Sequence, residues 1–329
     1  MPTEDHPLVI AAGSDLTRQI AFGENSLNLN GVNDCRRLLV EAGIGHGLFF
    51  ITPNYFRQSV RMPPPAGKLL LNLISDADQN RQVLGVLERV LRDPSITALN
   101  PPARVKATAR EQVARRLEGI PGLAVPKTWR IALRDGKPHW EALRHTAFRF
   151  PAILRPIGTH GGEGVRLVAG PDDLPSPGAL REAYLTEFVD YRSDDGYYRK
   201  YRCFFIGRAI VFRHLIVSDH WSVHAGDRKR LMLRTEWMMR EEEAIHAAGA
   251  AHFGAERMTT LERIRSAIGL DYFGLDFAVL ASGELLLFEA NATMNFFPFS
   301  TPDRGHYSWR CLPVAVEAIR ALVTDRLAP

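Results

Sequence analysis

Apolar runs alternate with amphipathic segments in the first third of the chain. Near-continuous apolar stretches at 8–13, 47–53 and 68–75 predict buried strands, because strands of a parallel sheet are covered on both faces. Between them, 31–43 carries apolar residues at helical spacing, and 76–92 shows the same spacing more strongly, with acids at its start. This order predicts a small α/β lobe at the N-terminus.

A different order begins at the boundary-like segment Asn100-Pro101-Pro102. An Arg- and Ala-rich stretch at 104–117 predicts one helix. Short apolar segments then predict three strands at 129–133, 150–156 and 165–169, which we interpret as an antiparallel lid, and another strand at 183–189. Further on, 201–206 and 209–216 predict a hairpin, 235–268 two helices, and 312–327 a closing helix.

Two acids and an amide interrupt an apolar hairpin at 271–297. Glu289 and Asn291 share a strand face, since successive side chains point to opposite faces. A two-residue turn at Ser282-Gly283, or a bulge with the same effect, sets Asp276 opposite Glu289, whereas a three-residue loop sets it opposite Phe288. Three oxygen donors on one patch suit a hard cation such as Mg²⁺. The alternative is that the two acids mark strand ends that face solvent.

A glycine-rich segment follows a strand that ends in a basic residue, Arg155. Bare backbone N–H groups of such a loop can approach a triphosphate, and the arginine can neutralise charge. A glycine-rich hairpin turn without a ligand is the alternative. The candidate phosphate-binding residues are Arg155, Gly158, Thr159, His160, Gly161 and Gly162.

Other candidates lie after the lid. Glu187, Phe188 and Val189 end a strand that would become a hinge whose backbone reads adenine, and Asp194 in the next polar loop is placed for ribose hydroxyls. A solvated acidic loop explains Asp194 equally well. Arg202 and Arg213 interrupt apolar strands, and because a buried arginine needs a partner, each is a candidate for an anionic ligand.

Composition narrows the classes of protein. The 329 residues are 46% hydrophobic and 24% charged, which predicts a folded globular chain. A net charge of +4 without a dense basic run gives no reason to expect nucleic acid. Three distant cysteines predict neither a zinc site nor a disulfide scaffold, and favour a reducing cytoplasm. We expect no signal peptide and no membrane span.

Taken in order, these motifs resemble an ATP-grasp ligase of the RimK/glutathione synthetase type over residues 99 to about 325. The quoted segments are Leu99–Pro102, Pro126–Thr128, Ile153–Val165, Thr186–Val189, Tyr201-Arg202, and Asp276 with Phe288–Asn291. The resemblance implies that the chain contains both helices and sheets, in the broad α/β class, and that it adopts the α+β fold called ATP-grasp. Its lobes would be a pre-ATP-grasp α/β lobe over 1–101 and an ATP-grasp domain over 102–329, divided into a lid at about 102–187 and a C-terminal subdomain at about 188–329.

The resemblance also implies roles. Asp276, Glu289 and Asn291 would hold two Mg²⁺ ions, with Mn²⁺ able to substitute, and the glycine loop would cover the ATP phosphates. Arg155 stands where the family has a lysine. The family's other nucleotide-binding lysine, on the first helix, has no clear match, with Lys106 and Arg110 nearest, and its acid before Arg202 is absent.

The implied function is an ATP- and Mg²⁺-dependent carboxylate–amine ligase that forms an amide through an acyl phosphate. Arg155, Arg202 and Arg213 would be its catalytic residues. Its partners would be ATP and a carboxylate and an amine, as small molecules or peptides, and a homo-oligomer is compatible with this. The alternatives are a small-molecule kinase of the same fold and a nucleotide-binding protein without ligase activity.

Overall fold

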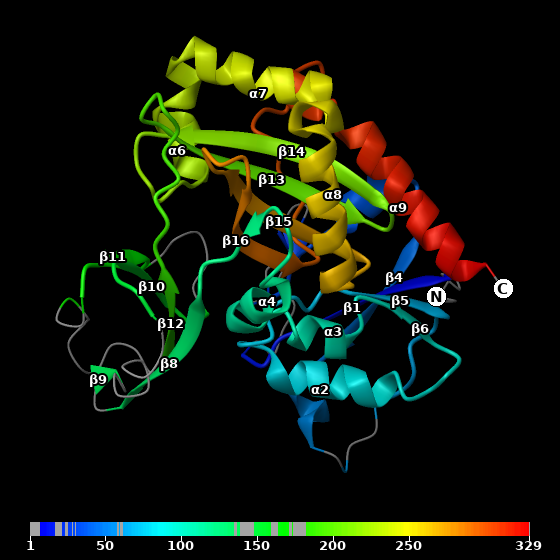
Figure 1. Ribbon diagram of the computed structural model, residues 1–329. Coiled ribbons are helices and arrows are strands. Elements are labelled where there is room, and N and C mark those ends of the chain that lie inside the picture. The colour runs from blue at the N-terminus through cyan, green and yellow to red at the C-terminus, as the bar shows by residue number, and fades with distance from the viewer. Residues whose placement is uncertain are drawn as a thin grey trace.

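Three main sheets organise the computed structural model of the chain (Figure 1). The structure describes residues 7–16, 22–23, 26–27, 29, 31–57, 59, 62–134, 137–138, 148–158, 164–170, 173 and 182–328. None of the helices within these ranges is both long and apolar enough to cross a membrane.

The first lobe is built on a parallel four-stranded sheet, as the apolar runs predicted. The strand order is β4-β1-β5-β6, with β1 at Leu8–Gly13, β4 at His46–Ile51, β5 at Leu69–Asn72 and β6 at Thr97–Leu99. Helix α1 (Arg36–Glu41) buries its two leucines in this lobe and leaves Val40 exposed, whereas α2 (Arg81–Val90) buries Val83, Leu84, Val86 and Leu87. Short elements complete it: β2 (Phe22–Gly23), β3 (Ser26–Leu27) and the 3-10 helix η1 (Pro53–Phe56).

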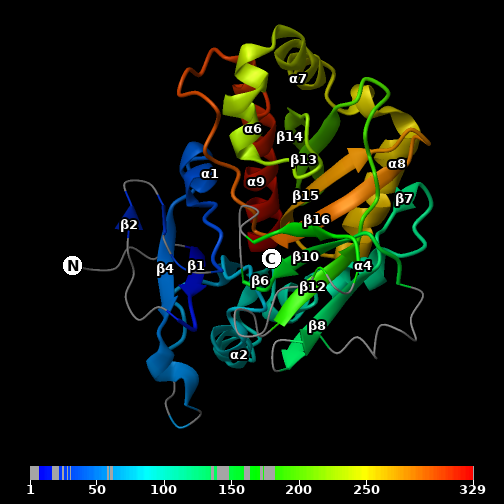
Figure 2. The ribbon, with the colours of Figure 1, turned by 90° about the vertical axis from the view of Figure 1, so that its left-hand side faces the viewer.

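The predicted antiparallel lid is confirmed as a separate sheet with its own small apolar core. The strands follow the order β11-β10-β12-β8-β9, with β8 at Thr128–Arg134, β9 at Lys137–Pro138, β10 at Ala152–Pro156, β11 at Arg166–Val168 and β12 at Glu182–Glu187. Leu154 and Leu185 face each other across β10 and β12 in that core. Figures 1 and 2 both show β8 and β12 next to β16 of the third sheet.

The single helix predicted over 104–117 is wrong, because the chain breaks between two helices. Helix α3 (Pro102–Lys106) ends before a turn, and α4 (Arg110–Leu117) begins after Ala109, whose backbone is extended. Helix α4 packs on β16, and the short strand β7 (Leu123–Ala124) joins the third sheet. The range predicted for the lid, 102–187, therefore includes elements that pack outside the lid sheet, and the predicted domain boundaries stay predictions.

The third sheet carries the predicted hairpins in the order β14-β13-β15-β16-β7. Its long strands are β13 (Tyr198–Ile206), β14 (Ala209–Ser218), β15 (Tyr272–Val279) and β16 (Leu285–Ala292). Phe253 of α8 stacks on Phe212 of the sheet, with ring centroids 4.3 Å apart. The remaining helices, several of which pack on this sheet, are α6 (Ala225–Arg230), η3 (Met232–Arg234), α7 (Glu236–Ala248), α8 (Ala250–Ile268), η4 (Tyr307–Trp309) and α9 (Leu312–Leu327).

A buried polar network joins the first lobe to the third sheet. Asn100, which has a positive φ of 54°, donates its side-chain amide to the carbonyl of Tyr272 at 2.6 Å and to Thr293 Oγ1 at 3.0 Å. Its backbone N–H donates to Asp271 Oδ2 at 2.9 Å, and Thr293 Oγ1 donates to the carbonyl of Asn72 at 2.8 Å. Because each of these groups finds a partner across the boundary, the two lobes meet without unsatisfied polar atoms among them.

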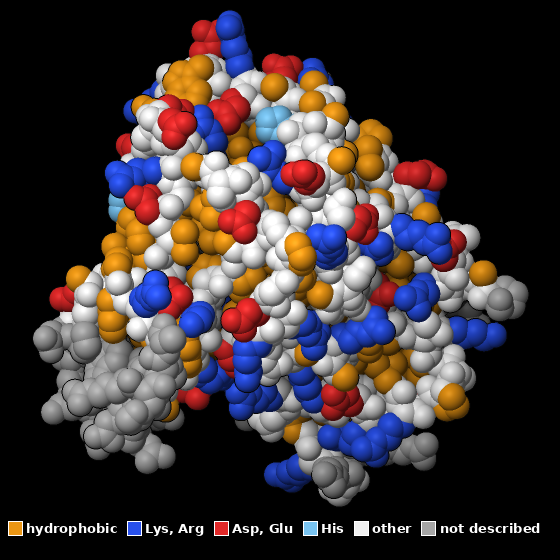
Figure 3. Space-filling view, viewed as in Figure 1, with side chains coloured by type: hydrophobic (Ala, Val, Ile, Leu, Met, Phe, Trp, Pro, Cys, Tyr) orange, Lys and Arg blue, Asp and Glu red, His pale blue; other side chains and the backbone are white. Residues whose placement is uncertain are grey.

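Basic side chains gather on the surface formed by α2, α3 and α4 (Figure 3). Acids are interspersed among them, and Lys106 of α3 pairs with Glu88 of α2 at 2.7 Å. This exposed pair has little energetic weight, because surface ion pairs are screened by water and salt. The cations of the candidate site are different, because they are half-buried between the lid and the third sheet.

Candidate active site

The two acids of the hairpin at 271–297 lie opposite each other, as predicted. Asp276 on β15 pairs with Glu289 on β16. The turn is longer than two residues, since Leu280 donates its N–H to Glu284 O and Gly283 donates to Leu280 O. The register shifts between Asp276 and Phe277, which leaves Phe288 as an extra residue on β16. This bulge, rather than the turn, brings Glu289 opposite Asp276.

Arg202, Asp276 and Glu289 form a row across three neighbouring strands. Arg202 on β13 lies in register with Asp276 on β15, which in turn lies in register with Glu289 on β16. Arg202 binds Asp276 with two hydrogen bonds, Nε to Oδ1 at 2.6 Å and Nη2 to Oδ2 at 2.7 Å. Burial disfavours the charge on Arg202, but Asp276 outweighs it and raises the pKa of Arg202 above its ordinary value.

Glu289 is held by a residue that lies far away in sequence. Arg110, the first residue of α4, forms a short ion pair with the Glu289 carboxylate and a weaker hydrogen bond, 3.4 Å long, to the carbonyl of Phe288. Burial alone would raise the pKa of Glu289. Arg110, Arg155 and Arg202 together lower that pKa well below its usual range, so the carboxylate is ionised at neutral pH.

Cations outnumber carboxylates in this site. Lys200 Nζ lies 3.7 Å from Asp276 Oδ2 and donates to the carbonyl of Val223 at 2.6 Å. Arg155, at the end of lid strand β10, is close enough to interact with both acids. Burial, and then repulsion by Arg110, lower the pKa of Arg155 to about 10. The folded protein thus disfavours the charged form of Arg155, and such a perturbed cation is typical of a site that binds an anion.

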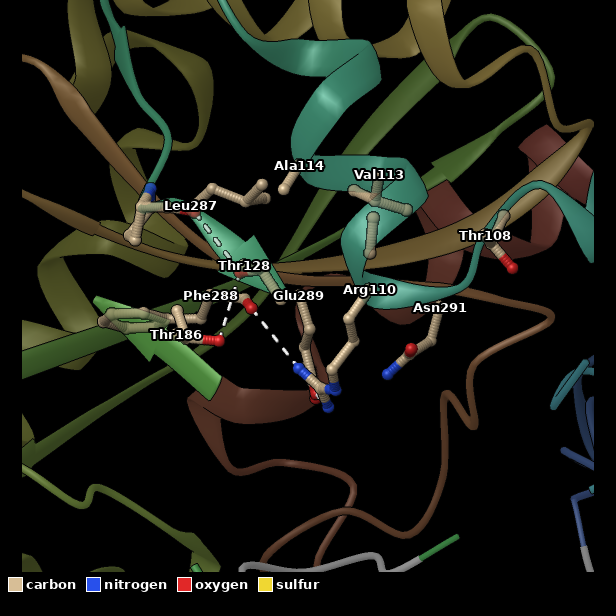
Figure 4. A pocket seen from close by; sticks show the side chains of 12 residues that line it. Thr108, Arg110, Val113, Ala114, Thr128, Thr186, Leu287, Phe288, Glu289 and Asn291 are labelled. Carbon is tan, nitrogen blue, oxygen red and sulfur yellow. Dashed lines mark hydrogen bonds and ion pairs between the residues drawn. The ribbon is translucent and has the colours of Figure 1, made fainter. Parts of the chain in front are cut away.

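A small cavity of about 30 Å³, lined by both polar and apolar residues, lies between the lid and β16 (Figure 4). Arg110 and Glu289 meet at it, and Asn291 lies beside them. Thr128 and Thr186, on paired lid strands, close the other side, with their hydroxyl oxygens 3.1 Å apart. The volume is about that of one water molecule, so this is the floor of a site rather than a complete ligand pocket.

The residues predicted to read a nucleoside lie at the end of β12. Glu187 accepts a hydrogen bond from the N–H of Arg149 at 2.9 Å, and Phe188 packs edge-on against Trp221. Val189 is partly buried against the main core, and Asp194 lies exposed in a turn. Their ligand-binding roles stay predictions.

The glycine segment is described only in part. Gly158 has a positive φ of 80°, and its carbonyl accepts a hydrogen bond of 2.7 Å from Gln79 Nε2 of the first lobe. A Cβ at Gly158 would come within 3.1 Å of that amide nitrogen, so the close approach favours glycine. The other candidates, Thr159, His160, Gly161 and Gly162, lie outside the described residues.

Arg213 has partners other than an anion. Its guanidinium donates to the carbonyls of Phe296 at 3.0 Å and Pro298 at 2.9 Å, and stacks 3.8 Å from the centroid of the Phe299 ring. Only 5% of the residue is exposed, and burial lowers its pKa to about 10. These contacts fix the segment that follows β16, and the catalytic role of Arg213 stays a prediction.

Arg110 is the main site residue that the candidate set lacks. It was noted in the sequence only as one of two basic residues nearest to a missing lysine. Lys200 and the two threonines are also missing from the predicted site residues, although Lys200-Tyr201 stands where the family has an acid before Arg202. The proline-threonine segment 126–128 was the available signal for Thr128.

The residues present fit a Mg²⁺ ion whose coordination is completed by a ligand. Asp276, Glu289 and Asn291 supply the oxygen donors that Mg²⁺ prefers. Both carboxylates, however, are engaged by guanidinium groups. Over the part of the chain that the structure describes, no three or more His, Cys, Asp or Glu side chains are grouped to hold a metal. Water and phosphate oxygens would supply the remaining ligands.

No protein-family model matches the chain, and no curated protein matches it. Solved structures are similar over almost its whole length. The D-Ala:D-Ser ligase VanG from Enterococcus faecalis has a TM-score of 0.52 and 10% identity, covering 97% of this chain and 100% of its own. The ATP-grasp ligase PsnB, complexed with precursor peptide PsnA2 and AMPPNP, has a TM-score of 0.50 and 14% identity, covering 98% and 99%.

A RimK-domain ATP-grasp protein from Sphaerobacter thermophilus has a TM-score of 0.49 and 15% identity, covering 96% of this chain and 99% of its own. At these identities the VanG and PsnB similarities concern the fold alone. The chain has the ATP-grasp fold, which confirms the fold class and the resemblance predicted from its motifs.

Proposed function

We propose that this protein is an ATP- and Mg²⁺-dependent ligase that joins a carboxylate to an amine. The observation that carries the proposal is the row of Arg202, Asp276 and Glu289, with Arg110 and Arg155 facing it from α4 and the lid. The site lies between two sheets of an ATP-grasp fold. PsnB, which shares the fold, has been solved with a peptide and AMPPNP, and with Mg and ADP.

In this proposal the nucleotide lies between the lid and the third sheet. Arg155 and Gly158 would face the phosphates, together with Thr159, His160, Gly161 and Gly162. The hinge formed by Glu187, Phe188 and Val189 would contact adenine, and Asp194 the ribose. The excess of cations supports a polyphosphate here, because each arginine can bind phosphate oxygens bidentately.

The reaction would have two steps. An oxygen of the substrate carboxylate attacks the γ-phosphorus of ATP, the bond to the bridging oxygen breaks, and an acyl phosphate and ADP result. The amine then attacks the acyl carbon and displaces phosphate, leaving an amide and releasing a proton. Arg155 and Arg202 would neutralise the charge on the transferring group, and Arg213 would support the substrate side.

Asp276, Glu289 and Asn291 would hold the Mg²⁺ that accompanies the nucleotide, and Mn²⁺ would be able to substitute for Mg²⁺. When bound, the ion supplies electrostatic stabilisation to the phosphate oxygens. The chain's own part is to keep the two acids ionised and aligned, which the register of β15 and β16 provides.

The test is ADP release by the purified protein with Mg²⁺ against a panel of amino acids and dipeptides. Asp276→Asn and Glu289→Gln should each lower ADP release at least about 100-fold, since each removes charge from the proposed ion site. Glu284→Gln is the matched control, because Glu284 lies in the loop of the same hairpin and is exposed. It should leave ADP release unchanged.

Product analysis separates the ligase from its alternatives. An amide supports the proposal, whereas a stable phosphorylated product indicates a kinase of the same fold. Binding of ATP, seen as a thermal shift, without turnover of any acceptor indicates a nucleotide-binding protein. Full ADP release by both acid variants would contradict the assignment of the ion site.

A further inference from the structure

Each carboxylate of the site already has a cationic partner within the protein. Asp276 is bound by Arg202 and Glu289 by Arg110. A metal ion that used both acids would therefore have to displace two guanidinium groups. The two arginines are held on their carboxylates to different degrees. This difference decides which of the two acids a metal ion can reach.

The pair of Arg202 and Asp276 is part of the sheet. The two residues lie in register on neighbouring strands, form two hydrogen bonds of 2.6 and 2.7 Å, and leave only 2% of the Asp276 side chain exposed. Bidentate pairing fixes both the distance and the orientation of the carboxylate. Asp276 is thus occupied on the side that faces its neighbour and closed to solvent.

The pair of Arg110 and Glu289 is less tightly held. Arg110 comes from the start of α4 and uses one nitrogen for Glu289, whose side chain is 20% exposed, against 2% for Asp276. Its second contact, to the carbonyl of Phe288, is 3.4 Å long and weak. Arg110 can therefore turn away from Glu289 by side-chain rotation, without any change in the strands.

The charges of the site favour one divalent ion rather than two. Arg110, Arg155, Lys200 and Arg202 face Asp276 and Glu289, so four cations meet two anions and leave a net charge of +2. An ion alone would add to this excess, which is unfavourable at short range. A triphosphate brings about four negative charges, and one divalent ion then returns the site to neutrality.

We propose that Arg110 makes metal binding conditional on the nucleotide, and that the site takes a single divalent ion. Without nucleotide, Arg110 holds Glu289 and excludes the ion. The phosphates of a bound nucleotide draw Arg110 away, and Glu289 and Asn291 then bind one ion together with phosphate oxygens, while Asp276 stays with Arg202. This inference rests on the proposed nucleotide site. It replaces the two ions that the family resemblance implied, and it also replaces Asp276 as a direct ligand of the ion.

The test uses Mn²⁺ as the probe and its electron paramagnetic resonance signal as the readout of binding. The wild-type protein should bind Mn²⁺ at least tenfold more weakly without AMPPNP than with it, and should hold one Mn²⁺ per bound AMPPNP. Arg110→Met should bind Mn²⁺ without nucleotide at least tenfold more tightly than the wild type. Arg110→Lys keeps the charge and should behave as the wild type.

Arg115→Met is the matched control, because Arg115 lies on the same helix and is exposed, with a hydrogen bond only to a backbone carbonyl of that helix. Two Mn²⁺ ions per AMPPNP in the wild type, or equal Mn²⁺ affinity with and without AMPPNP, overturns this inference and leaves the proposed function standing. Failure to bind AMPPNP at all overturns both. The wild-type titrations decide the matter even if Arg110→Met does not fold.

Discussion

Two regions beside the third sheet place arginine against a carboxylate, and they do so in opposite ways. Between α6 and α7, Arg228 pairs with Glu242, which is fully buried. At the candidate site, Arg202 and Arg110 pair with Asp276 and Glu289 beside two further cations. The first region matches one cation to one anion, and the second has an excess of cations.

The pair of Arg228 and Glu242 is complete in itself. The Glu242 carboxylate accepts hydrogen bonds from both terminal nitrogens of Arg228, from the hydroxyl of Tyr307 at 2.7 Å and from the N–H of Leu215 at 3.3 Å. Arg228 also donates to the carbonyl of Leu215 at 3.0 Å. No capacity is left for a ligand, so this pair holds elements together. The comparison teaches that unmatched charge, rather than an ion pair as such, indicates a binding site.

The largest expected effect comes from removing one cation from each region. Arg228→Met should lower the free energy of unfolding by about 3–5 kcal/mol, because it leaves Glu242 charged and buried without a cation. Arg110→Met should lower it by less than about 1 kcal/mol, since Arg155, Arg202 and Lys200 remain near Glu289. Urea unfolding at pH 7.5 measures both. Equal losses would contradict the distinction between the two regions.

A low pH should lower the stability of the region around the Arg228–Glu242 pair, because His246 lies near Glu242. Burial, joined by repulsion from Arg213, Arg228 and Arg310, lowers the pKa of His246 to about 4 against the attraction of Glu242. The native state keeps this imidazole neutral, so its contribution is complete above about pH 6.5 and is lost as the pH falls towards 4.

We therefore expect the wild type to lose about 2 kcal/mol of stability through His246 between pH 6.5 and 5. His246→Asn should show a correspondingly shallower loss. Glu289 does not change the stability between pH 6.5 and 5. Its pKa is lowered in the folded state, so the stability that it contributes is lost only as the pH falls through and below the ordinary pKa of a carboxyl. Urea unfolding at several pH values measures the slopes, and parallel slopes for the two proteins would rule out this role.

The smallest effect has the opposite sign. Arg155→Met should raise the free energy of unfolding by about 1 kcal/mol, because it removes a cation that burial and Arg110 disfavour. The same change should weaken AMPPNP binding at least tenfold. Arg155→Lys keeps the charge and should show a smaller gain. A loss of stability in Arg155→Met, measured by thermal unfolding, would mean that the cations are not in excess.

The elements that sequence reasoning predicted well are those with a strong local period. The parallel strands of the first lobe, the lid strands and both hairpins follow from apolar runs and turn residues. The pairing of Asp276 with Glu289 was also predicted, although a bulge at Phe288 produces it. Two registers were open in the sequence because loop length and bulges depend on the packing of the whole hairpin.

The features that the sequence did not predict depend on contacts between distant segments. The break between α3 and α4 lies in a stretch rich in alanine and arginine, which favour helix, and it positions Arg110 for a partner 179 residues away. Arg213 was predicted to meet an anion because a buried arginine needs a partner, but carbonyls of Phe296 and Pro298 take that place. Such partners follow from tertiary packing, which a local pattern does not contain.

The amide of Asn100 has a practical consequence for work with this protein. Asn100 and Asn72 belong to the first lobe, whereas Asp271, Tyr272 and Thr293 flank the strands that carry the acids. A shortened chain starting after Pro101 would lack Asn72 and Asn100 and would leave the buried polar groups of Asp271, Tyr272 and Thr293 without these partners. Fragment expression should therefore keep the first lobe, and chimeras should exchange it together with residues 271–293.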